Sequence, residues 1–133
     1  MKAITTEDKL KEAGRMIQHI VERAEKNIAE YMEAAQEDFC NFFHWHAAGM
    51  YQAQKTRAYF TAMPQVTKYD DINVLIEAMN KRIKNIENEL INSSAFGTCC
   101  NEVVNLEHRL DLDSKRVIRE KLLNILWVLE EED

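Results

Sequence analysis

The apolar residues of this chain recur every three or four positions over long stretches, which is the spacing of one face of an α-helix. The first stretch starts near Thr6, where Thr5 and Thr6 are candidate N-caps and Glu7 and Asp8 suit a helix N-terminus. Its face consists of Leu10, Ala13, Ile17, Ile20, Ala24, Ile28, Tyr31 and Ala35. Three glycines and one proline among 133 residues leave few points for turns. Long helices are therefore favoured over a β architecture with many turns.

The same rhythm continues beyond this face as far as Ala53. Two alternatives remain open for this region: one helix from about Thr6 to Ala62, or two helices that meet between Gln36 and Gly49. A single helix of that length would span roughly 85 Å at 1.5 Å per residue, which is too long for a compact monomer. The first alternative would therefore require a partner chain along the helix.

Pro64 ends this region, because the residue before a proline is pushed out of the helical backbone conformation. Asp70 or Asp71 is then placed to cap a second helical stretch, whose apolar face follows a seven-residue repeat. That face consists of Ile72, Ile76, Met79, Ile83, Ile86 and Leu90. Residues 92–98 form the clearest loop, since they combine asparagine, serine, glycine and threonine.

Two further helices are expected after this loop, a short one over residues 100–110 and a last one capped by Asp113. The inward side of the short helix would hold Val103, Leu106 and Leu110. Leu112 and Val117 are placed as a hydrophobic staple around the Asp113 cap. The apolar stripe of the last helix consists of Val117, Ile118, Leu122, Ile125, Leu126 and Leu129.

Together these patterns predict an all-α fold, a four- or five-helix bundle with a long N-terminal helical region, in a single helical domain over residues 1–133. No run approaches the ~18 apolar residues that a membrane-spanning helix needs. Residues 1–15 are charged where a signal peptide would be apolar. Three cysteines, Cys40, Cys99 and Cys100, do not make a disulfide framework. We therefore expect a cytoplasmic protein without a membrane partner.

One segment differs in composition from the rest of the chain. Residues 39–69 contain none of the 23 acidic residues and eight of the eleven aromatic ones. The eight are Phe39, Phe42, Phe43, Trp45, Tyr51, Tyr59, Phe60 and Tyr69. The formal charges in this segment are Lys55, Arg57 and Lys68, and His44 and His46 lie beside them in sequence.

Two overlapping interpretations of this acid-free segment remain open. It could be the most buried part of the fold, because buried segments gather aromatics and lose carboxylates; Phe42, His46, Met50 and Ala53 would then be core. It could also be a contact surface, because interface cores share this composition and the aromatics surround the helix rather than lining one side. The candidate partner-binding residues are Phe42, Phe43, Trp45, Tyr51, Lys55, Arg57 and Tyr59.

A nucleic-acid-binding regulator is an alternative. It would use Lys55 and Arg57 together with the cluster Lys81, Arg82 and Lys84, since aromatic and basic groups can stack bases and hold phosphates. The net charge of −6 and the pI near 5.3 argue against it, and no nucleic-acid-binding motif is present.

A metal-binding helical protein is the other alternative. Glu37, Cys40 and His44 would share one helical face as zinc ligands, although paired ligand motifs are missing. The adjacent Cys99 and Cys100 could be reactive. Arg15 and His19 share a helix face, a pairing too common to define a catalytic site.

No cofactor is predicted, and no catalytic residue can be assigned. The favoured function is a non-enzymatic regulatory or adaptor protein that acts through protein–protein contacts, using segment 39–69. Because two-fold symmetry is the commonest arrangement of self-associating chains, we expect a homodimer.

Overall fold

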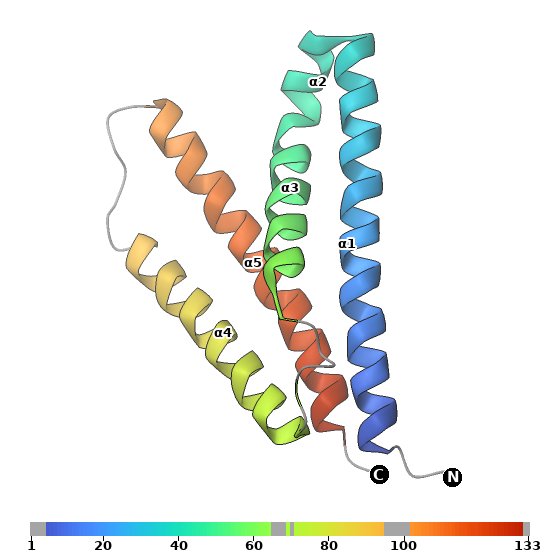
Figure 1. The fold of residues 1–133 in the computed structure, drawn as a ribbon. Coiled ribbons are helices and arrows are strands. Elements are labelled where there is room, and N and C mark those ends of the chain that lie inside the picture. The colour runs from blue at the N-terminus through green and yellow to red at the C-terminus, as the bar shows by residue number, and fades with distance from the viewer. Residues whose placement is uncertain (1–4, 65–68, 70, 95–101, 132–133) are drawn as a thin grey trace.

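The computed structural model describes residues 5–64, 69, 71–94 and 102–131. Within these ranges the chain forms five helices and no strand, which confirms the predicted all-α bundle. They are α1 (Thr6–Glu37), α2 (Phe39–Trp45), α3 (Ala47–Ala62), α4 (Ile72–Ser94) and α5 (Glu102–Glu130). Figure 1 shows two antiparallel pairs, α1 with α3 and α4 with α5, which diverge from a common base. No helix in the described ranges has the length and apolar content needed to cross a membrane.

The break between α1 and α3 lies where two helices were expected to meet, so the alternative of one continuous helix is wrong. Asp38 adopts an extended backbone (φ −154°, ψ 95°) and donates its N–H to the carbonyl of Ala34, 3.1 Å away. Its carboxylate accepts the N–H of Asn41 at 3.1 Å. One residue thus ends α1 and caps α2. His46 then separates α2 from α3.

Capping residues also explain two other helix starts. The hydroxyl of Thr5 accepts the N–H of Asp8 at 3.1 Å, which confirms Thr5 as the cap of α1. The carboxylate of Asp71 accepts the N–H of Asn73 at 2.9 Å, so Asp71 caps α4. Asp70, the alternative cap, lies outside the described residues.

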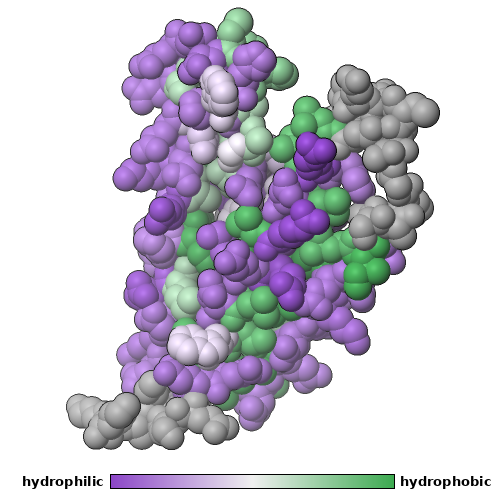
Figure 2. Space-filling view, turned by 180° about the vertical axis from the view of Figure 1, so that it is seen from behind, coloured by the Kyte–Doolittle hydropathy of each residue, from purple (hydrophilic) through white to green (hydrophobic). Residues whose placement is uncertain are grey.

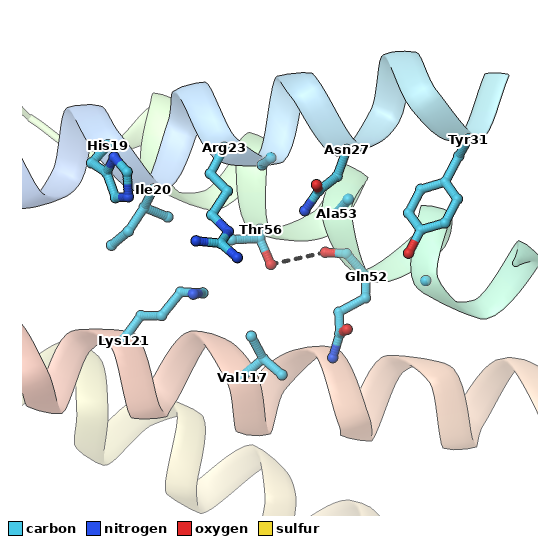
Figure 3. A pocket seen from close by; sticks show the side chains of 12 residues that line it. His19, Ile20, Arg23, Asn27, Tyr31, Gln52, Ala53, Thr56, Val117 and Lys121 are labelled. Atoms are coloured by element: carbon cyan, nitrogen blue, oxygen red, sulfur yellow. Dashed lines mark hydrogen bonds between the residues drawn. The ribbon is translucent and has the colours of Figure 1, made fainter. Parts of the chain in front are cut away.

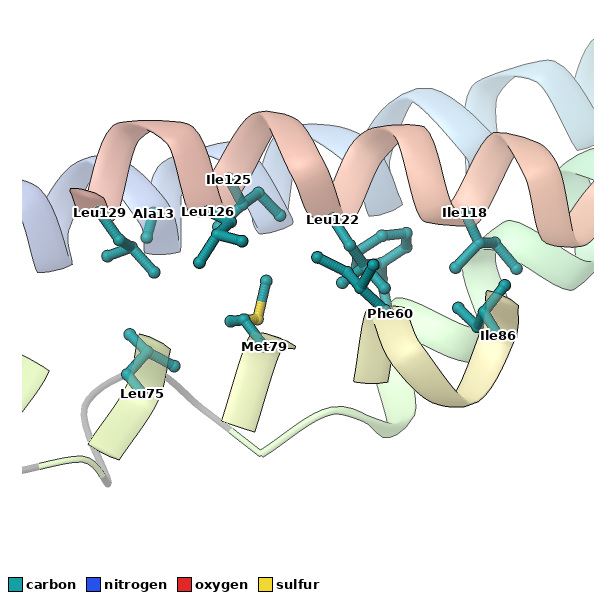
Figure 4. Close-up of a cluster of buried hydrophobic side chains, with 11 residues drawn as sticks. Ala13, Phe60, Leu75, Met79, Ile86, Ile118, Leu122, Ile125, Leu126 and Leu129 are labelled. Atoms are coloured by element: carbon teal, nitrogen blue, oxygen red, sulfur yellow. The ribbon is translucent and has the colours of Figure 1, made fainter. Parts of the chain in front are cut away.

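The core lies mainly between α4 and α5, at the base of the two pairs (Figure 4). The heptad face of α4 is confirmed: Met79, Ile83 and Ile86 are buried, and the remaining positions of the repeat pack partly buried against the core. From α5 the core takes Ile118, Leu122, Ile125, Leu126 and Leu129. Leu75 of α4, outside the predicted repeat, Ala13 of α1 and Phe60 of α3 complete it.

The prediction of two helices after residue 100 is wrong, since α5 runs without a break from Glu102 to Glu130. Asp113 is not a cap; its carboxylate binds Arg116 at 2.9 Å on the helix surface. Ser114 is buried and donates its hydroxyl to the carbonyl of Leu110 at 2.8 Å, so the helix stays continuous beside it. Leu106, expected to face inward, is 51% exposed.

The loop predicted over residues 92–98 is only partly described by the structure. Residues 92–94, expected in the loop, belong to α4. Residues 95–98, Cys99, Cys100 and the side chain of Val103 lie outside the described part of the structure.

The acid-free segment is not the most buried part of the fold. Of the residues expected to be core, Phe42 and Ala53 are buried, whereas His46 and Met50 are half-buried. The segment adds Thr56 and Phe60 to the buried set. Burial therefore accounts for only part of its aromatic content.

Two ion-pair groups hold α4 against α5. Lys115 of α5 lies 2.8 Å from the carboxylate of Asp111 and 3.4 Å from that of Glu89 on α4. Arg119 pairs with Glu87 of α4 at 2.9 Å. The hydrogen bond to Asp111, with the charges of both carboxylates, raises the pKa of Lys115 against the opposing effect of desolvation.

We expect Lys115→Gln to lower the free energy of unfolding by about 0.5–1 kcal/mol at pH 7. A raised lysine pKa stabilises the folded state fully below the ordinary pKa of 10.5, and this stabilisation is lost as the pH rises through the higher folded-state value. The difference between wild type and variant should therefore shrink at alkaline pH. Urea titrations across this range measure it, with Lys84→Gln, an exposed lysine of α4, as the matched control. A difference that grows with pH would contradict the assignment.

Candidate functional site

The short helix α2 forms an exposed aromatic tip at the end of the α1–α3 pair. Phe39 is 65% exposed, Phe43 63% and Trp45 76%, whereas Phe42 is buried. The rings of Phe42 and Phe43 lie 6.2 and 6.4 Å from that of Phe39, measured between centroids. Figure 2 shows pale green atoms at the upper end of the molecule, where α2 lies. A helix of seven residues with one side chain buried leaves its remaining aromatics facing solvent.

The predicted partner-binding residues do not form one continuous surface. Phe43 and Trp45 lie on the aromatic tip. On α3, the ammonium of Lys55 lies 5.3 Å from the ring centre of Tyr51. Tyr59 is half-buried and packs edge-on against Phe60, with centroids 5.4 Å apart. Only part of the predicted set is therefore free to meet a partner.

The basic residues of the nucleic-acid alternative are likewise separated. Arg57 pairs with Glu25 of α1 at 3.3 Å, and two residues along a helix it faces away from Lys55. The guanidinium of Arg82 lies 5.6 Å from the ring centre of Tyr59, and one of its nitrogens is 3.4 Å from the hydroxyl of that tyrosine. Lys81 and Lys84 remain exposed. No single basic surface results, so nothing in the geometry favours this alternative.

The predicted metal ligands are not brought together as a site. The extended backbone of Asp38 interrupts the helix between Glu37 and Cys40, so the spacing that would place these residues and His44 on one face is lost. In the part of the chain that the structure describes, no three His, Cys, Asp or Glu side chains group closely enough to hold a metal ion. Cys40 is an exposed free thiol.

A second candidate site is a cavity of about 370 Å³ between α1, α3 and α5. Figure 3 shows Arg23 of α1 and Lys121 of α5 reaching into it from opposite walls, with His19 at one end. Asn27 and Gln52 contribute amide groups. The remaining lining residues are Ile20, Ala24, Tyr31, Gly49, Ala53, Thr56 and Val117. We call this space the basic cavity.

Among the described residues, none forms an ion pair with Arg23, Lys121 or His19. Arg15, two turns before Arg23 on α1, differs: it is paired with Glu12, 2.9 Å from its Nε, and this hydrogen bond lowers the pKa of Glu12. The hydroxyl of Thr56 donates to the carbonyl of Gln52 at 2.8 Å. The basic cavity thus combines unpaired positive charge with amide donors and acceptors.

Sequence reasoning missed the basic cavity, although part of its signal was present. Arg15 and His19 stand four residues apart, and the same spacing continues to Arg23, Asn27 and Tyr31 along one stripe of α1. Lys121 comes from the last helix, and only the packing of α5 against α1 places it opposite this stripe.

Fold and geometry define the protein as an all-α five-helix bundle with two candidate sites in its described part. Comparisons with protein-family models, with curated proteins and with solved structures gave no match.

Proposed function

We propose that this protein is a non-enzymatic regulatory or adaptor protein that acts through protein–protein contacts made by the aromatic tip, and that it forms a homodimer there. The observation that carries the proposal is the exposure of Phe39, Phe43 and Trp45 on one short helix. Large aromatics dominate interface energetics, and Phe39 and Phe43 lie together on the tip, with ring centroids 6.4 Å apart, while Trp45 is exposed on the same short helix.

Charge supports a second copy as the partner. The chain carries a net charge of −6, so two copies repel over most approaches. Helix α2 contains no Asp or Glu, and its aromatic side chains can pack on their own counterparts across a two-fold axis. The tip is therefore less acidic than the rest of the chain, with Glu37 and Asp38 exposed directly before it.

A cytoplasmic setting is part of this proposal. Cys40 lies on the aromatic tip as an exposed free thiol, and a reducing compartment would keep it from forming disulfides.

Sedimentation velocity over a concentration series tests the proposed dimer. We expect wild type to dimerise and the double variant Phe43→Ser/Trp45→Ser to remain a monomer. Trp127→Ser is the matched control, because Trp127 is 70% exposed on α5, away from the tip, and should leave dimerisation unchanged. Wild type that stays monomeric throughout, or a control that dissociates equally, would rule out the proposed dimer.

Tryptophan fluorescence gives an independent readout. In Trp127→Phe the remaining tryptophan, Trp45, reports on the tip alone. Its emission should shift to shorter wavelength with concentration, at the midpoint found by sedimentation, whereas Trp45→Phe should show no shift.

A further inference from the structure

We propose that the basic cavity binds a small organic oxyanion, a phosphate- or carboxylate-bearing molecule, held by Arg23 and Lys121. The aromatic tip takes no part in this site, so the proposal stands or fails separately from the proposed dimer.

The dimensions of the basic cavity suit a small molecule. Its volume of about 370 Å³ falls within the range of roughly 300–1,000 Å³ that is typical of ligand pockets. Three helices form its walls, so its shape is set by packing rather than by loops. Ile20, Ala53 and Val117 supply apolar surface for the body of a ligand.

The positive charges of Arg23 and Lys121 favour a negatively charged ligand. Arg23 and Lys121 point toward one another across the space, and their like charges repel unless an anion lies between them (Figure 3). Six other cations are ion-paired in the described ranges, and exposed unpaired ones such as Lys81 and Lys84 face solvent, whereas Arg23 and Lys121 face one cavity. Two cations without a partner in a shared cavity are therefore an arrangement that an oxyanion would stabilise.

The geometry of the donors favours an oxyanion over chloride. The guanidinium of Arg23 can present two parallel N–H groups to two oxygens of one phosphate or carboxylate, while the ammonium of Lys121 adds a point charge from the opposite wall. Asn27 and Gln52 lie farther along the cavity, where they can bind polar groups on the rest of the ligand.

The test is a ¹H–¹⁵N NMR titration of the full chain at constant ionic strength, with inorganic phosphate and succinate as separate probes. We expect shifts confined to amides lining the basic cavity, among them those of Arg23, Gln52 and Lys121. The probe that binds more tightly assigns the phosphate or the carboxylate class.

Arg23→Gln and Lys121→Gln should each weaken binding by about tenfold or more, because each removes a charge-assisted hydrogen bond. Lys84→Gln, which removes an exposed cation of α4, should leave binding unchanged. Arg23→Lys keeps the charge but loses the two-pronged donor, and should weaken binding less than Arg23→Gln.

Three results would each overturn the proposal: no shift at cavity amides with either probe, equal shifts with chloride alone, or equal weakening in Lys84→Gln. Thermal melts of each variant establish that it is folded. If Arg23→Gln does not fold, the titrations of wild type and Arg23→Lys still decide the matter.

Discussion

Replacing Leu122 by alanine should lower the free energy of unfolding by about 3 kcal/mol, the largest effect we expect of any single substitution considered. Leu122 has no exposed surface, and Figure 4 shows its side chain directed at Phe60 of α3, within the cluster completed by α4. The substitution removes buried methyl groups and leaves a cavity that closely packed helices cannot fully close.

Urea unfolding followed by circular dichroism measures this loss. The denaturant midpoint should fall while the slope stays constant, because the surface exposed on unfolding hardly changes. Trp127→Ala, at an exposed site on the same helix, should cost less than about 1 kcal/mol. Equal losses in the two variants would place the core elsewhere.

The second effect is expected at Gly49, where α1 and α3 approach closely. A Cβ atom at this position would lie 2.9 Å from Cζ of Tyr31 and closer still to its hydroxyl oxygen. Real side chains do not tolerate such contacts, so Tyr31 would have to move away from α3. The atoms met are the far end of the half-buried Tyr31 side chain, so we expect Gly49→Ala to destabilise the protein by no more than about 1 kcal/mol, although alanine is the better helix former.

A double-mutant cycle separates the clash from the helix propensity. In a Tyr31→Ala background the obstacle is gone, and Gly49→Ala should become stabilising by up to about 1 kcal/mol. The sign of the effect therefore reverses between the two backgrounds. If Gly49→Ala stabilises both, Tyr31 does not pack against α3 at this position.

The helices themselves were largely predictable because their signals are local. The Thr5 cap depends on residues within one turn, and the heptad face of α4 depends on spacing alone. The break at Asp38 was harder to find, since the apolar rhythm continues across it. At Asp113 a helix start was predicted where the helix is continuous. A carboxylate that can cap a helix can equally pair with Arg116 on a helix surface, and residue spacing does not distinguish a cap from an ion pair.

The candidate sites depend on contacts between distant residues, and these were less predictable. Phe42 and Phe43 are neighbours of one residue type, yet the structure buries the first and exposes the second. Composition could not separate them, because protein interiors and interface cores are both rich in aromatics. The basic cavity requires α5 to pack against α1, which no local pattern predicts.

The packing of α5 has a consequence for how the chain is made. It is the last of the five described helices to leave the ribosome, yet it contacts α1, α3 and α4. Until Ile118, Leu122 and Ile125 have emerged, α4 lacks its main packing partner, and the sides of α1 and α3 that meet α5 have no cover. Such exposed surface is where nascent chains aggregate or recruit chaperones. The core can therefore be completed only when α5 has been synthesised, and the risk of aggregation lasts until then.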